Sequence, residues 1–158
     1  MSDAKTHIVL PTVSGEVPSG YAGDIPADEA WRTLSENPGA VLIDVRTSAE
    51  WSFVGIPDLS SVGRDALLIE WQAYPDMAIN RTFVDDVVAT LGDVDKDIPV
   101  LLLCRSGARS RSAAIALTRA GFRHSYNVVG GFEGDLNEAR HRGARNGWKA
   151  SGLPWRQN

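Results

Sequence analysis

Four consecutive apolar residues, Val100-Leu101-Leu102-Leu103, constrain the fold of this chain more than any other stretch. A run without alternation predicts a strand that is buried on both faces, as in the middle of a parallel sheet. The run ends at Cys104, the only cysteine among 158 residues. A polar, cationic loop follows, and Ala113, Ala114 and Leu117 then recur on one face of a helix. The sequence therefore places its single cysteine where a buried strand passes through a short loop into a helix.

The surroundings of Cys104 favour an anion. Backbone N–H groups at a helix N-terminus have no intrahelical partner, so they bind negative charge. Arg105, Arg109 and Arg111 add positive charge nearby. We therefore expect the pKa of the Cys104 thiol to lie below the ~8.5 of a free thiol, and its thiolate to be exposed enough to act as a nucleophile. The alternative is a small buried residue of the core, which is the commoner role of a lone cysteine.

Further strand and helix patterns alternate along the chain. Residues 40–43 and 66–69 predict two more buried strands, 125–129 predict a last strand, and 21–25 predict a short edge strand. Helices are predicted at 26–34, from about residue 48, at 80–91 and at 111–120. This alternation predicts one α/β domain with a mostly parallel sheet of about five strands and helices on both faces.

Asp44 ends one of the apolar runs, as the cysteine does. The carboxyl ends of parallel strands meet along one edge of a sheet, where open α/β folds bind ligands. Asp44 can therefore hydrogen-bond the amides of the cysteine loop or orient Arg46, or it can cap the helix that begins near Ser48. Arg46 and Glu50 stand four residues apart, and we expect them to form an ion pair that holds this turn.

The length and composition predict one domain with additions at both ends. A chain of 158 residues with 43% hydrophobic content can build one core. We expect an irregular N-terminal arm at 1–20, a domain at 21–140 and a C-terminal extension at 141–158. Because Trp148 and Trp155 would be costly to leave in water, we expect the extension to pack on the domain near the last helix and to lend charge to the rim of the site.

The charge is unevenly distributed, although the net charge is only −4. Residues 1–100 carry 6 Lys/Arg against 17 Asp/Glu, net −11, whereas residues 101–158 carry 10 against 3, net +7. Only one of these ten cations is a lysine, and we expect a positive field that favours small anionic substrates rather than nucleic acid.

Other features predict where the protein acts and what it lacks. A single cysteine excludes an internal disulfide and fits a reducing compartment. No apolar run is long enough for a membrane span, and the first residues do not begin a signal peptide, so we expect a cytoplasmic protein without membrane contact. The histidines, His7, His124 and His141, form no ligand pattern, and we predict no metal site and no cofactor.

Three motifs resemble those of the rhodanese-like sulfurtransferases and together cover roughly residues 25–138. The first resembles the active-site loop of the family, Cys104-Arg105-Ser106-Gly107-Ala108-Arg109-Ser110. The second resembles a strand ending in Asp-Val-Arg, then Glu, then Gly-His-Ile-Pro; this chain reads Asp44-Val45-Arg46, Glu50 and, without the histidine, Val54-Gly55-Ile56-Pro57. The third resembles the last strand and its glycine turn, Val128-Val129-Gly130-Gly131-Phe132.

The resemblance implies a three-layer rhodanese-like fold and a sulfurtransferase. Cys104 would carry a sulfane sulfur, as a persulfide, from a small donor such as thiosulfate to an external thiol, to cyanide or to a partner protein. The substrate would be bound by the loop residues Arg105, Ser106, Gly107, Ala108, Arg109 and Ser110. Asp44 and Arg46 would support the loop. No second cysteine is present to take the sulfur, so it must leave to an outside acceptor.

Two alternatives stay open at this point. A persulfide carrier or binding module for a partner protein would keep the same loop, and the sequence does not separate it from an enzyme. A cysteine-loop phosphatase or arsenate reductase needs an arginine after Cys and five further residues. Here Arg109 follows after four, and Ser110 occupies the position that this pattern requires for arginine.

Overall fold

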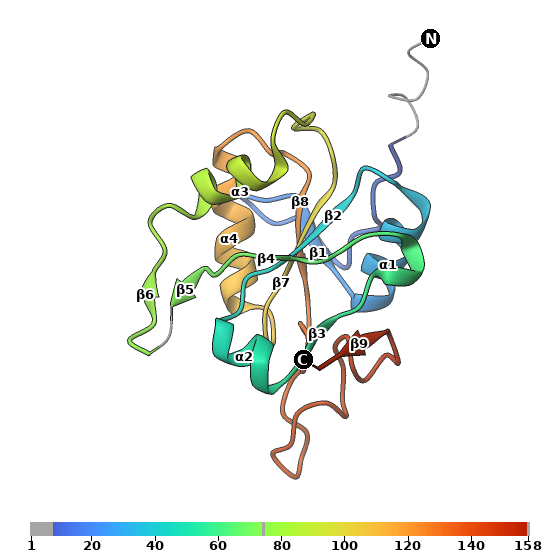
Figure 1. Cartoon of the computed structure of the whole chain (residues 1–158). Helices are drawn as coiled ribbons and strands as arrows, with labels where there is room; N and C mark the ends of the chain where they lie inside the picture. Colours follow the sequence, from blue (N-terminus) through green and yellow to red (C-terminus); the bar gives the residue numbers. More distant parts are fainter. Residues whose placement is uncertain (1–7, 74, 158) are drawn as a thin grey trace.

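The central sheet contains five parallel strands in the order β1-β8-β7-β2-β4 (Figure 1). The computed structural model describes residues 8–73 and 75–157. The strands of the sheet are β1 (Gly23–Ile25), β2 (Val41–Asp44), β4 (Leu67–Leu68), β7 (Val100–Leu103) and β8 (Ser125–Val128). The prediction of a mostly parallel five-stranded α/β sheet is confirmed, with the apolar run 100–103 at its centre.

Helices cover both faces of the sheet, which gives three layers (Figure 1). Helix α1 (Ala27–Glu36) lies on one face, and α3 (Phe83–Leu91) and α4 (Ala108–Arg119) lie on the other. The remaining elements are short: α2 (Ser48–Phe53), the 3-10 turn η2 (Ser60–Val62), the antiparallel pair β3 (Ile56–Pro57) and β9 (Trp155–Arg156), and the pair β5 (Gln72–Ala73) and β6 (Ala78–Ile79). Within the described parts of the chain, no helix has the length and apolarity needed to cross a membrane.

The alternating side chains of β7 divide the core in two. Leu101 and Leu103 point to the face that α1 covers. Val100 and Leu102 point to the face of α3 and α4, and the residue after the strand, Cys104, continues this alternation. The cysteine side chain is therefore directed between the sheet and α4.

Strand β4 differs from the buried strand predicted at 66–69. It contains only two residues and forms an edge of the sheet, where it pairs with β2 alone. Leu68 is 38% exposed. The prediction of burial on both faces is wrong here because an edge strand has no neighbour on its outer side, and a short apolar run does not reveal how many neighbours it has.

Residues 8–20 follow the surface of the domain and are tied to it. The backbone N–H of Ser14 donates to the carbonyl of Asp24 at 2.7 Å, and that of Thr12 donates to the carboxylate of Glu29 at 2.7 Å. These bonds fix a segment that the sequence marked only as an irregular arm. The first seven residues of that predicted arm lie outside the described residues.

The C-terminal segment packs against the face that α1 covers. Trp148 is fully buried, and its ring lies edge to face with Trp31 of α1, with 5.9 Å between the ring centroids. Its indole N–H donates to the carbonyl of Pro154 at 2.7 Å, and β9 then pairs with β3. The expected position near the last helix is wrong, because α4 lies on the opposite face of the sheet.

Candidate active site

Cys104 follows β7 directly, and its sulfur lies at the N-terminal end of α4. The backbone N–H of Gly107 donates a hydrogen bond to Sγ at 3.1 Å, and Ser110 Oγ lies 3.2 Å from Sγ. Cys104 is only 1% exposed. The expectation of an exposed sulfur is therefore wrong for this conformation, because the side chain shares the inner face of Leu102 and packs beneath the start of α4.

The backbone of the cysteine loop is held by the glycine turn that follows β8. The N–H of Phe132 donates to the carbonyl of Cys104 at 2.8 Å, and the next two amides donate to the carbonyl of Arg105 at 3.0 and 3.1 Å. A Cβ on Gly131 would collide with both of these carbonyl groups, and the φ of this residue is +58°. Glycine is therefore required where the two loops approach each other.

The residues of the cysteine loop differ in their exposure to solvent. Arg105 and Ala108 are exposed, Ser106 and Gly107 are half-buried, and Ser110 is fully buried. A cavity of about 430 Å³ lies beside the loop. The loop contributes Ser106, Gly107 and Ala108 to the lining of this cavity. Other parts of the chain contribute Tyr21, Asp24, Arg111 and Asn127.

A chain of hydrogen bonds connects the sulfur with the edge strand β1. Ser110 Oγ donates to Asn127 Oδ1 at 2.6 Å, and Asn127 Nδ2 donates to Asp24 Oδ1 at 3.1 Å. The hydroxyl of Tyr21 donates to the same oxygen of Asp24 at 2.8 Å. The parallel register of β1 and β8 places Asp24 directly opposite Asn127. The structure thus joins these residues to the cysteine.

Sequence reasoning missed Asn127 and Asp24. The available signal was a polar residue inside the buried run 125–128, near the carboxyl end of a predicted strand. In a parallel sheet that end lies on the edge where the cysteine also lies. Asp24 could not be found in this way, because only the register between β1 and β8 brings it to the site.

Arg109 forms an ion pair with Glu50 of α2. The two side chains form a bidentate ion pair, with distances of 2.7 and 3.0 Å. Burial disfavours the charged form of Glu50, but the hydrogen bonds and the charge of Arg109 outweigh it and hold the pKa of this carboxyl below its usual value. Burial also opposes the charge on Arg109, yet its pKa is raised because Glu50 binds it.

Arg46 binds Asp44 instead of Glu50, so the predicted ion pair of Arg46 with Glu50 is wrong. Arg46 Nε and Nη2 donate to the carboxylate of Asp44 at 2.9 and 2.7 Å, and Nη2 also donates to the carbonyl of Gly55 at 2.7 Å. Both charged side chains are fully buried. Of the roles predicted for Asp44, the orientation of Arg46 agrees with these hydrogen bonds. The capping role is wrong, because Thr47 caps α2 in a capping box with Glu50.

The pair of Asp44 and Arg46 and the sulfur of Cys104 lie on opposite faces of the sheet. The guanidinium carbon of Arg46 lies 4.2 Å from the ring centroid of Phe132, which belongs to the core on the α1 face. Cys104 belongs to the core beneath α4. The structure therefore brings Cys104, Gly107 and Ser110 together, whereas the predicted supporting pair acts beneath the loop and not on the sulfur.

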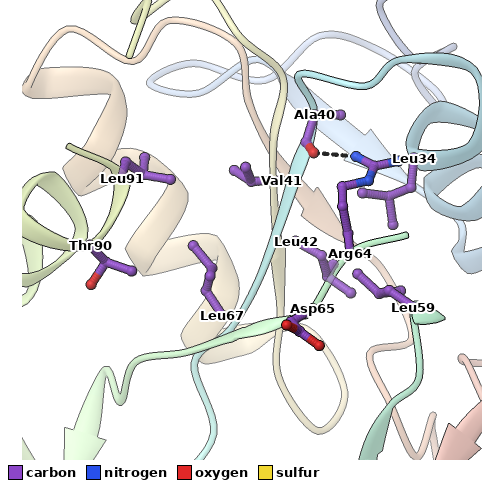
Figure 2. Close-up of a pocket in the computed structure, with 10 residues that line it drawn as sticks. All are labelled: Leu34, Ala40, Val41, Leu42, Leu59, Arg64, Asp65, Leu67, Thr90 and Leu91. Atoms are coloured by element: carbon purple, nitrogen blue, oxygen red, sulfur yellow. Dashed lines mark hydrogen bonds between the residues drawn. The ribbon is translucent and has the colours of Figure 1, made fainter. Parts of the chain in front are cut away.

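Another cavity, of about 310 Å³, lies at the amino-terminal end of β2 (Figure 2). Its lining is mainly aliphatic, and Arg64 crosses it to donate to the carbonyl of Ala40 at 2.5 Å. Burial lowers the pKa of this arginine. Because Asp44 ends β2 and Cys104 follows β7, this cavity lies at the other end of the sheet and does not border the cysteine loop.

Replacing Glu50 with glutamine is expected to remove a pH-dependent part of the stability. Gln at this position keeps the capping box but removes the charge that binds Arg109. A carboxyl with a lowered pKa in the folded state contributes stability above its ordinary pKa, and the contribution is lost as the pH falls through its folded-state pKa. Urea unfolding of both proteins at several pH values should show a constant difference near neutrality that shrinks below about pH 4.3.

Glu36→Gln is the matched control for this prediction. Glu36 pairs with Arg32 on the exposed side of α1, where the two side chains are 49% and 39% exposed. An exposed pair of this kind contributes little to stability, so the control should stay close to wild type at every pH. A difference between wild type and Glu50→Gln that grows in acid would contradict the assignment.

Comparisons with known proteins show which chains this one is similar to. A family model described as the STR4 middle domain matches residues 22–158, which include the C-terminal extension. The RP600 homolog of Rickettsia rickettsii is 36% identical over 132 residues, which make up 84% of this chain and 95% of that protein. The thiosulfate sulfurtransferase GlpE of Actinobacillus pleuropneumoniae serotype 5b (strain L20) is 30% identical over 131 residues, 83% of this chain and 90% of that protein.

A solved structure shows the same architecture. The crystal structure of Rv0390 from M. tuberculosis is similar with a TM-score of 0.79 and 51% sequence identity, and the match covers 87% of this chain and 99% of that one. The parallel sheet, the cysteine loop before α4 and these matches all indicate one family. The chain belongs to the STR4 middle-domain family and is a rhodanese-like domain of the sulfurtransferases.

Proposed function

We propose that the protein transfers a sulfane sulfur from a small anionic donor, such as thiosulfate, through a persulfide on Cys104. The observation that supports this most directly is the position of Sγ at the start of α4, 3.1 Å from the N–H of Gly107. An N–H group at a helix N-terminus stabilises negative charge. Both the thiolate and the persulfide carry such a charge on or next to this sulfur.

The transfer takes two displacements at sulfur and needs no external oxidant. In the first, the Cys104 thiolate, formed by loss of the thiol proton to solvent, attacks the outer sulfur of thiosulfate. The S–S bond of the donor breaks, and its electron pair leaves with sulfite. In the second, an external thiolate or cyanide attacks the outer sulfur of the persulfide and leaves as a persulfide or as thiocyanate. The electron pair of that S–S bond returns to Cys104 as the thiolate.

The charges around the loop suggest which cations meet the donor. Arg109 is balanced by Glu50, so its field at the sulfur is reduced. Arg105 is exposed at the loop, and Arg111 lines the cavity beside it. We assign the attraction of the anionic donor to Arg105 and Arg111, and the holding of the reacting sulfur to the N–H of Gly107. Since Cys104 is 1% exposed, the segment 105–107 has to move for the donor to reach Sγ.

The similarity to GlpE, which is named a thiosulfate sulfurtransferase, supports thiosulfate as the donor to test first. The expected result is that incubation with thiosulfate adds the mass of one sulfur atom to the intact protein, and that cyanide removes it and yields thiocyanate. Cys104→Ser should show neither change, because a hydroxyl does not form a stable persulfide. Intact-protein mass spectrometry and a thiocyanate assay measure both steps.

Ser112→Ala serves as the matched control, because Ser112 lies on the exposed side of α4 and its hydroxyl bonds to the carbonyl of Ala108. It should gain and lose sulfur as wild type does. Sulfur that loads onto Cys104 but passes neither to cyanide nor to small thiols would favour a carrier for a partner protein. Failure of the wild type to gain sulfur from thiosulfate would contradict the proposed donor.

A further inference from the structure

We propose that Asn127 and Asp24 are positioning residues that keep the Cys104 sulfur protonated in the resting protein, by fixing the direction of the hydrogen bonds that end at Ser110. This inference rests on the proposed role of Cys104 as the reacting group. It concerns the control of that sulfur and not its substrate.

The direction of the chain follows from its outer end. A carboxylate only accepts hydrogen bonds, so the group of Asn127 that faces Asp24 must be its amide nitrogen, at 3.1 Å. The hydroxyl of Tyr21 donates to the same oxygen. Burial and the neighbouring carboxylate raise the pKa of Tyr21, while Arg111 opposes this in part. Tyr21 therefore keeps its proton and does not compete as an acceptor for the amide of Asn127.

The orientation of Asn127 then determines what Ser110 can do. With its nitrogen on Asp24, Asn127 presents Oδ1 to Ser110 at 2.6 Å, and an oxygen of this kind only accepts. The single hydroxyl proton of Ser110 is therefore directed to Asn127. In the contact of 3.2 Å between Ser110 Oγ and Cys104 Sγ, the thiol of Cys104 is therefore the donor.

This arrangement favours the thiol over the thiolate. A thiolate has no proton to donate, so it would face the lone pairs of Ser110 unless the hydroxyl turned away from Asn127. Turning would leave Oδ1 of Asn127 without a donor at a residue that is 4% exposed, and an unsatisfied buried acceptor is costly. The N–H of Gly107 acts in the opposite sense, because it favours the anion.

Charged groups on the neighbouring elements complete the electrostatic setting. Arg109 of α4 is paired with Glu50 of α2. Asp44 of β2 lies on the opposite face and is paired with Arg46. These pairs reduce the net charge near the sulfur. The further cations around the site are Arg105, exposed on the loop, and Arg111, which lines the cavity beside it.

The site can be switched without a large movement. Asn127 and Asp24 both line the cavity of about 430 Å³ that borders the loop. A group bound there that competes for Asp24, or a rotation of the Asn127 amide, would release the Ser110 hydroxyl toward the sulfur. The structure thus assigns control of the nucleophile to a strand edge remote in sequence from the cysteine loop.

The test is the pH midpoint of thiolate formation, followed by ultraviolet absorbance with Cys104→Ser as the baseline. The signal belongs to one residue, because Cys104 is the only cysteine. In Asn127→Leu, the Ser110 hydroxyl is released to donate to the thiolate, and the midpoint should fall by about one pH unit, the order expected for one hydrogen bond to a charged group. An unchanged or raised midpoint would overturn the proposal.

Ser110→Ala separates this route from a general electrostatic effect. Alone it should not raise the midpoint, because the wild-type hydroxyl does not donate to the sulfur; a rise would overturn the proposal. Combined with Asn127→Leu, it should abolish the fall, as a double-mutant cycle requires for groups that act through each other. A fall that persists without Ser110 would also overturn it. Asp24→Leu, on a half-buried edge position, removes the acceptor that fixes the Asn127 amide and repeats the same cycle if Asn127→Leu does not fold.

Ser125→Ala is the matched control for loss of a buried polar group on β8. Ser125 is fully buried two residues before Asn127 but bonds to the carbonyl of Phe122 at 2.7 Å. Its midpoint should equal that of wild type, and an equal fall in this variant would overturn the proposal. The titration uses no sulfur donor, so it can succeed while persulfide formation fails, or the reverse, and the two proposals are judged separately.

Discussion

Replacing Arg46 with leucine is expected to lower the free energy of unfolding by about 3–5 kcal/mol. The variant removes the guanidinium that holds the carboxylate of Asp44 through Nε and Nη2. Asp44 would then be fully buried without its ion-pair partner. The stacking of Arg46 on the ring of Phe132, 4.2 Å away, would be lost as well. Urea unfolding at neutral pH measures the effect.

A second substitution distinguishes a stranded charge from lost packing. Asp44→Asn in the Arg46→Leu background removes the buried charge and keeps an oxygen that can accept from the backbone N–H of residue 46, as Oδ1 of Asp44 does at 3.1 Å. Since an apolar or neutral replacement of both partners is far less costly than removal of one, the double variant should recover most of the lost stability. A double variant no more stable than Arg46→Leu would show that the charge is not the cause.

Replacing Trp148 with alanine is expected to cost about 3–5 kcal/mol, the usual range for a fully buried large aromatic residue. The side chain is fully buried and makes an edge-to-face contact with Trp31. Its indole N–H also satisfies the carbonyl of Pro154. The loss would detach the C-terminal segment from α1, and thermal or urea unfolding should show it directly.

Trp155→Ala offers a comparison within the same segment. Trp155 is 40% exposed, although its ring meets Phe132 edge to face at 6.1 Å and the ammonium of Lys149 lies 3.9 Å from its centroid. Because less of its surface is buried, this variant should lose less than half as much stability as Trp148→Ala. Equal losses, or a Trp148→Ala protein as stable as wild type, would contradict the role of Trp148 as the anchor.

The fold could be predicted largely from runs of residues that are close in sequence. The uninterrupted apolar residues of β7 predicted a central buried strand, and the residues after Cys104 predicted the loop and α4, because each depends on local pattern alone. The helices predicted at 26–34 and 80–91 correspond to α1 and α3 for the same reason. The edge position of β4 was missed because the number of neighbours of a strand is a property of the whole sheet.

The partners of the charged residues could not be predicted in the same way. The spacing of Arg46 and Glu50 favoured an ion pair between them, yet Glu50 binds Arg109, 59 residues away. Both facts follow from packing. The short helix α2, of 6 residues, directs Glu50 toward Arg109 at the start of α4, whereas Arg46 binds Asp44 in the core. The pairing of Asp24 with Asn127 depends likewise on strand register, which a single sequence does not encode locally.

The contact of the cysteine loop with the turn around Gly131 limits how this site could be transplanted into another protein. A graft of residues 104–110 alone would leave behind the three amides of residues 132–134 that hold the carbonyls of Cys104 and Arg105. The recipient would carry the cysteine on a loop whose backbone carbonyls lack these hydrogen bonds. A graft of this site would therefore have to include two segments from distant parts of the chain, residues 104–110 and the turn at 131–134.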